Sequence, residues 1–190
     1  MTRFPVLPLQ AVRDVKILLD EQQVHQCVER LAREITAAYQ SHPLTIVAVM
    51  TGSVVLVADL IRQLSIPLRV GVLQASSYKG RTVRGELTIN SALMPDVANR
   101  DVLLIDDIFD TGHTLEQVTA LVGKLGPTTL RSCVLLRKAG RQEVDFQPDF
   151  VGFEIPDEFV VGYGLDYRDF YRNLPYIAVL DPEDIANTLP

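Results

Sequence analysis

Apolar positions along the chain follow two spacings, which predict helices alternating with buried strands. From Asp20 to Tyr39 they recur every three or four residues, which predicts one amphipathic helix that ends at the breaker Ser41-His42-Pro43. Further helices are expected over 53–64 and from the turn at 111–114 to Leu125. Continuous apolar runs are typical of fully buried parallel strands, and they predict strands over 44–50, 67–73, 101–108 and 129–136.

This order of elements predicts an α/β fold with a doubly wound, mostly parallel sheet flanked by helices. Ligands of such sheets bind beyond the carboxyl ends of the strands. The rim there should carry Thr51 and Gly52, the 76–90 segment, the 106–114 loop and Lys138. The 76–90 segment is polar and basic and has no helical face, so we expect a partial hairpin with a mobile tip.

Residues 102–114 are the strongest local signal of chemistry. An apolar run ends in Asp106 and Asp107, and Asp-Thr-Gly-His-Thr then opens the next predicted helix. Backbone N–H groups at such a turn suit a phosphate, and Gly112 lets the backbone approach closely. A carboxylate beside a phosphate is repelled unless a sugar hydroxyl or a cation lies between the two. Asp106 and Asp107 therefore indicate a ligand that carries both a phosphate and a diol, with magnesium as a candidate cation. The loop lacks the P-loop and dinucleotide fingerprints. The alternative is an ordinary strand–turn–helix corner with a capping residue.

Composition fits one compact domain of 190 residues. The net charge of −6 gives no sign of a nucleic-acid footprint, so no nucleic-acid partner is expected. Cys27 and Cys133 match no metal or redox spacing, and Cys133 lies in an apolar run that predicts a buried thiol. The first residues lack the apolar region of a signal peptide, and no apolar run reaches membrane-spanning length. A cytoplasmic protein without a membrane partner is therefore expected.

Two independent stretches resemble one enzyme family. Residues 106–114 resemble the phosphoribosyl pyrophosphate loop of the type I phosphoribosyltransferases. Residues 156–167 resemble the hood of the hypoxanthine-guanine phosphoribosyltransferases, the purine-salvage branch, and the likeness extends from about Leu44 to Arg172. It implies one domain over 1–190, with a core of about 20–138 and a small hood of about 139–190 that includes the segment 1–19.

The resemblance implies roles for the residues that would bind phosphoribosyl pyrophosphate. Asp106 and Asp107 would bind the ribose hydroxyls, and the 5′-phosphate would lie on Thr111, Gly112, His113 and Thr114. Thr51 and Gly52 occupy the pyrophosphate loop, where the family often has a cis peptide, here Met50–Thr51. Ser77 and Tyr78 would begin the lid. Some relatives carry Lys or Arg at the position of Thr51, whereas this chain has no positive charge there.

The resemblance also implies a purine site. Asp110 would lie near N7 of the base and handle its proton, and Lys138 would donate to the 6-oxo group. Phe159 would stack on the ring, and Val160 would bind it through its backbone. Asp166, together with Asp106 and Asp107, would bind Mg²⁺, and Arg172 would bind the pyrophosphate.

The resulting expectation is a magnesium-dependent purine-salvage enzyme that makes inosine or guanosine monophosphate as a homodimer or homotetramer. One alternative is a non-catalytic regulator that senses phosphoribosyl pyrophosphate on the same fold. Another is a phosphoribosyltransferase for a different base, such as xanthine. The sequence leaves open the preferred 6-oxopurine, the effect of Thr51, and whether His113 is more than an exposed residue of the first helical turn.

Overall fold

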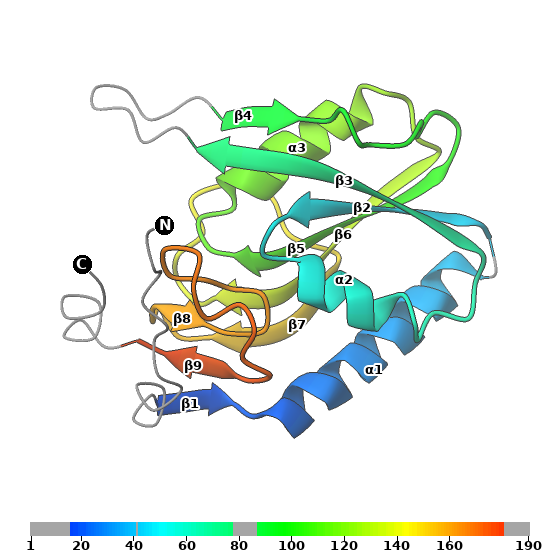
Figure 1. The fold of residues 1–190 in the computed structure, drawn as a ribbon. Helices are drawn as coiled ribbons and strands as arrows, with labels where there is room; N and C mark the ends of the chain where they lie inside the picture. Colours follow the sequence, from blue (N-terminus) through cyan, green and yellow to red (C-terminus); the bar gives the residue numbers. More distant parts are fainter. Residues whose placement is uncertain (1–15, 41, 78–86, 181–190) are drawn as a thin grey trace, which may run out of the picture.

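The fold consists of a six-stranded sheet with helices on both faces and a separate three-stranded sheet (Figure 1). It was obtained as a computed structural model, which describes residues 16–40, 42–77 and 87–180. The helices are α1 (Glu21–Tyr39), α2 (Val54–Leu60) and α3 (His113–Gly123). The strands are β1 (Lys16–Leu19), β2 (Leu44–Met50), β3 (Leu68–Ser77), β4 (Leu87–Asn90), β5 (Asp101–Phe109), β6 (Thr129–Lys138), β7 (Phe150–Ile155), β8 (Val160–Val161) and β9 (Ile177–Val179).

The large sheet has the strand order β4-β3-β2-β5-β6-β7, in which only β4 runs antiparallel to its neighbour. The predicted doubly wound, mostly parallel α/β fold is therefore confirmed. The order reverses beside β2 and β5, which is where such sheets bind their ligands. In Figure 1 the arrowheads of the parallel strands point to one side, and β1, β8 and β9 lie on that same side.

Strand β5 shows how the sequence specifies two cores. Successive side chains of a strand point to opposite faces. Leu103 and Ile105 accordingly join the cluster formed with α1 and α2, while Val102 and Leu104 join the cluster formed with α3. All four are fully buried, which is why this strand is an unbroken apolar run until Asp106. The carboxylates thus begin where the apolar run of the strand ends, and Asp106 is itself buried.

Several element boundaries differ from the sequence-based prediction. Helix α1 begins as expected, because Asp20 caps it: its carboxylate accepts from the Gln23 N–H at 2.8 Å. Helix α2 ends at Leu60, before the predicted Leu64, and turns follow. Strands β3 and β6 extend to Ser77 and Lys138, past their apolar runs, because neighbouring strands continue the hydrogen-bond ladder there.

The small sheet joins parts of the chain that are far apart in sequence. Strand β9 pairs antiparallel with both β1 and β8, so the segment before α1 lies against the last described strand. Among the described residues, no helix is long and apolar enough to cross a membrane.

Candidate active site

The acidic pair lies at the end of β5, beside a cavity of about 240 Å³. The Asp106 carboxylate accepts from the Asp107 N–H, and the Asp107 carboxylate accepts from the Ile108 N–H, both at 3.0 Å. Burial raises the pKa of both carboxyl groups, and the adjacent charge of Asp107 raises that of Asp106 further. Two buried carboxylates that repel each other favour a ligand that brings hydroxyl donors or a cation.

The predicted phosphate loop lines the same cavity. Thr111, Gly112 and Thr114 all contribute to its wall, and α3 begins at His113, so the N-terminus of this helix opens onto it. Gly112 has φ of +93°, and a Cβ there would lie 2.5 Å from Val144 Cγ2. Only glycine fits this turn without strain. His113 is half-exposed, and its Nε2 lies within hydrogen-bond distance of Glu143 Oε2, at 3.1 Å.

The loop after β2 approaches the acidic pair from the neighbouring strand. The Met50–Thr51 peptide bond is cis, as the resemblance implied. Gly52 lines the 240 Å³ cavity, and a Cβ on it would clash with the Asp107 carboxylate. Thr51 is exposed and lines a neighbouring cavity of about 270 Å³. Of the two residues expected to begin the lid, Ser77 ends β3, while Tyr78 lies outside the described residues, as does the rest of the segment to 86.

A second cavity of about 210 Å³ brings together the residues expected to bind the base. Asp107, Asp110, Lys138, Phe159, Val160 and Asp166 all line it. The Phe159 side chain is 42% exposed, and its ring lies edge-on to that of Tyr167 with centroids 5.7 Å apart. Because Asp107 and Asp110 line both cavities, the two form one continuous site.

Four charged side chains form a cluster at this second cavity. Lys138, whose side chain is 11% exposed, places Nζ 3.7 Å from Asp110 Oδ2 and 3.4 Å from Asp157 Oδ1. Arg141 donates from Nε to Asp110 Oδ1 at 3.0 Å and lies 3.6 Å from Asp157. Sequence reasoning found Lys138 and Asp110 but missed Arg141 and Asp157. The Pro156–Tyr167 stretch contains Asp157, but nothing in the pattern marks Arg141.

Arg172 links the hood to the acidic pair. Its guanidinium lies 2.8 Å from Asp166 Oδ1 and donates to the Gly164 carbonyl at 2.7 Å. Burial raises the pKa of Asp107, and the charge of Arg172 offsets a small part of that rise. Among the described residues, no three His, Cys, Asp or Glu side chains are grouped to hold a metal by themselves. Mg²⁺ commonly binds one or two carboxylates and completes its shell with water and substrate oxygens. Asp166, Asp106 and Asp107 fit that kind of shared site.

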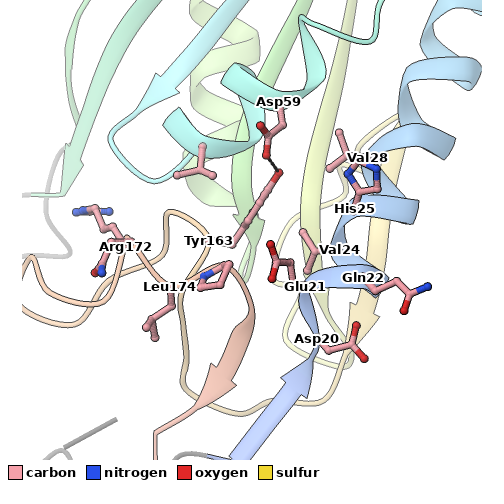
Figure 2. A pocket seen from close by; sticks show the side chains of 13 residues that line it. Asp20, Glu21, Gln22, Val24, His25, Val28, Asp59, Tyr163, Arg172 and Leu174 are labelled. Carbon is pink, nitrogen blue, oxygen red and sulfur yellow. Dashed lines mark hydrogen bonds between the residues drawn. The ribbon is translucent and has the colours of Figure 1, made fainter. Parts of the chain in front are cut away.

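A larger cavity, about 760 Å³, lies elsewhere, between the start of α1, α2 and residues 163–175 (Figure 2). Figure 2 shows Tyr163 reaching to Asp59, to which its hydroxyl donates at 2.7 Å. Three carboxylates line this cavity, from Asp20, Glu21 and Asp59. Arg172, which also lines it, already pairs with Asp166. Carboxylates also line the two smaller cavities, but these have the N-terminus of α3, which no described side chain caps, and Lys138. The N-terminus of α1 at the larger cavity is already capped by Asp20, so a phosphorylated ligand fits the smaller cavities better.

Comparison with known proteins agrees with this geometry. Residues 14–168 match the family model described as the phosphoribosyl transferase domain. Hypoxanthine-guanine phosphoribosyltransferases of Staphylococcus aureus and Staphylococcus epidermidis are 41% and 42% identical over 173 residues, which cover 90% of this chain and 97% of each relative.

Solved structures give the same result. A hypoxanthine phosphoribosyltransferase from Staphylococcus aureus superposes with a TM-score of 0.87 at 40% identity, covering 93% of this chain and 97% of that one. A hypoxanthine-guanine phosphoribosyltransferase from Bacillus anthracis gives 0.84 at 35% identity, covering 88% and 100%. The resemblance inferred from residues 106–114 and 156–167 is thereby confirmed, and the chain belongs to the phosphoribosyltransferase family.

Proposed function

We propose that this protein transfers the 5-phosphoribosyl group of phosphoribosyl pyrophosphate to hypoxanthine or guanine, giving the nucleoside monophosphate and pyrophosphate. The observation that carries the proposal is the base cavity, where Lys138, Phe159 and Asp110 meet beside the phosphate loop. In this proposal the core of about 20–138 holds the sugar and phosphates, and the hood of about 139–190 covers the base.

The sugar-phosphate half would be bound at the 240 Å³ cavity. The buried carboxylates of Asp106 and Asp107 would accept from the ribose hydroxyls, which relieves their mutual repulsion without a protein cation. The N–H groups of residues 111–114 and the start of α3 would hold the 5′-phosphate. Thr51 and Gly52 would meet the pyrophosphate through backbone groups, because Thr51 brings no positive charge.

The purine would enter the 210 Å³ cavity. The Lys138 ammonium has only donors, so it favours a 6-oxo acceptor and disfavours the 6-amino group of adenine. Phe159 is exposed enough to offer a ring face for stacking, and Val160 would contribute backbone hydrogen bonds. Adenine would offer the ammonium no acceptor at position 6, whereas hypoxanthine and guanine would.

The chemistry follows from these positions. A ring nitrogen of the purine forms a bond to the anomeric carbon while the bond from that carbon to the pyrophosphate oxygen breaks, and pyrophosphate leaves with the electron pair. The carboxylate of Asp110 accepts the proton released from N7. Arg172 would donate to the leaving pyrophosphate. When bound by Asp166, Asp106 and Asp107, Mg²⁺ would supply positive charge where the leaving group becomes negative.

A homodimer or homotetramer is part of the proposal. An exposed apolar side chain, Leu93, lines the cavity beside Thr51, where a second copy of the chain would cover it. Size-exclusion chromatography with light scattering decides this point, and a monomer at micromolar concentration would contradict it.

Pyrophosphate release measured with five nucleobases tests the proposed function. With phosphoribosyl pyrophosphate and Mg²⁺ present, hypoxanthine and guanine should be used, and adenine and orotate should be poor substrates. Xanthine tests the alternative base. Faster release with adenine or orotate would overturn the proposal, and no release with any base, together with intact binding of phosphoribosyl pyrophosphate, would favour the sensor.

A further inference from the structure

The connection between β6 and β7, residues 139–149, packs against Thr111, Gly112 and His113 of the phosphate loop. The Glu143 N–H donates to the Thr111 carbonyl at 2.9 Å, and the Glu143 carboxylate pairs with His113. The Val144 side chain packs at Gly112, where a Cβ would have no room. Because Lys138 stands at the start of this connection, the segment links the base-reading residue to the phosphate-binding turn.

Arg141 extends this connection to the carboxylate that would handle the proton. The two oxygens of Asp110 have different cationic neighbours: Arg141 Nε lies 3.0 Å from Oδ1, and Lys138 Nζ lies 3.7 Å from Oδ2. The first distance is a hydrogen bond, and the second is a looser ion pair. Asp110 is therefore oriented mainly by Arg141.

Binding of a 6-oxopurine would change only one of these two contacts. Lys138 must turn toward the 6-oxo group, so its ion pair with Oδ2 weakens as the base enters, and Oδ2 becomes free to meet N7. Arg141 does not line the base cavity, so its hydrogen bond to Oδ1 should persist when the base binds. Asp157, 3.4 Å from Lys138 and 3.6 Å from Arg141, keeps a cationic neighbour in either state.

We propose that Arg141 is a positioning residue that holds Asp110 by Oδ1 so that Oδ2 faces N7 once Lys138 has moved to the base. The proposal rests on the proposed function, because it assigns Arg141 a part in that same reaction. Arg141 acts through Asp110 and need not touch either substrate. Its side chain is 42% exposed, so replacing it should not disturb the core.

Single-turnover formation of inosine monophosphate tests this role, because it isolates the chemical step from product release. Arg141→Ala should slow this step about tenfold, the effect of losing roughly one charge-assisted hydrogen bond, and leave the Kd for phosphoribosyl pyrophosphate within about twofold. Arg141→Lys should recover part of the rate, since an ammonium can still donate to Oδ1. The matched control is Arg137→Ala, because Arg137 precedes Lys138 on β6 but pairs with Glu154 at 2.5 Å.

A double-mutant cycle supplies the decisive comparison. If Arg141 works through Asp110, then Arg141→Ala should have less than about a twofold effect in the Asp110→Asn background. An unchanged rate for Arg141→Ala would overturn the proposal, as would an equal tenfold loss in both backgrounds or an equal loss in Arg137→Ala. Failure of the wild-type protein to convert hypoxanthine would instead refute the proposed function, which keeps the two outcomes apart.

Discussion

Replacement of Lys138 gives the sharpest prediction about substrate choice. Its side chain is only 11% exposed, and its ammonium lies within 3.7 Å of two carboxylates. Lys138→Ala removes the donor to the 6-oxo group while leaving Arg141 beside both carboxylates, so the cavity keeps one compensating cation. We therefore attribute the change mainly to the lost contact with the base.

The magnitude follows from the type of bond. A hydrogen bond to a charged group contributes about 1.5–3 kcal/mol net. The kcat/KM for hypoxanthine should accordingly fall by a factor of roughly 10 to 150 in Lys138→Ala, since each 1.4 kcal/mol is about tenfold. Adenine has no 6-oxo acceptor for the ammonium, so the kcat/KM for adenine should stay low or rise slightly. The ratio of hypoxanthine to adenine should thus narrow by at least about tenfold.

Steady-state kinetics with both bases measures this ratio. Lys138→Gln adds a second arm, because an amide can donate to a 6-oxo group or accept from a 6-amino group, so adenine use should rise further. Lys124→Ala, an exposed residue at the end of α3, is the control and should leave the ratio unchanged. An active Lys138→Ala enzyme with the wild-type ratio would refute the reasoning.

Three further predictions concern other parts of the molecule. Asp107→Ala should weaken the binding of phosphoribosyl pyrophosphate more than the binding of free purine, as measured by calorimetry. An unchanged affinity for phosphoribosyl pyrophosphate would show that this carboxylate does not bind the sugar. Gly112→Ala should lower the thermal midpoint and phosphate-ligand affinity together, because φ is +93° and Val144 lies in the way, and an unchanged midpoint would contradict the strain. Burial raises the pKa of the Cys27 and Cys133 thiols, so they stay protonated in the folded protein and should react with a thiol reagent only after unfolding. Thiols of the unfolded chain ionise near about pH 8.5, whereas the buried thiols stay protonated above that pH. The free energy of unfolding should therefore be independent of these thiols below about pH 8.5 and should decrease above it, and urea unfolding with no such decrease would contradict this.

The sequence predicted those features that depend on neighbouring residues. Strand β5, the acidic pair and the turn at Gly112 are one continuous stretch, so the apolar run, the two carboxylates and the glycine could be interpreted together. The cis bond before Thr51 and the meeting of Lys138 with Phe159 came from the resemblance, because no periodicity reveals them.

What the sequence did not predict depends on contacts between distant segments. The pairing of β1 with β9 joins residues near opposite ends of the chain, and short strands carry little pattern of their own. Arg141 lies in a polar connection and looks like any solvated arginine until the fold brings it to Asp110, 31 positions earlier. The pairing of Arg172 with Asp166 likewise spans a turn in which Arg168, Asp169 and Tyr171 have positive φ, which no sequence pattern indicates.

A crystal structure of the protein with inosine monophosphate and Mg²⁺ tests the central claim most directly. The account predicts the 6-oxo group within hydrogen-bond distance of Lys138 Nζ, the ring stacked on Phe159, and the 5′-phosphate on the N–H groups of residues 111–114. A nucleotide bound instead in the 760 Å³ cavity between α1 and α2, or with its base away from Lys138, would contradict it.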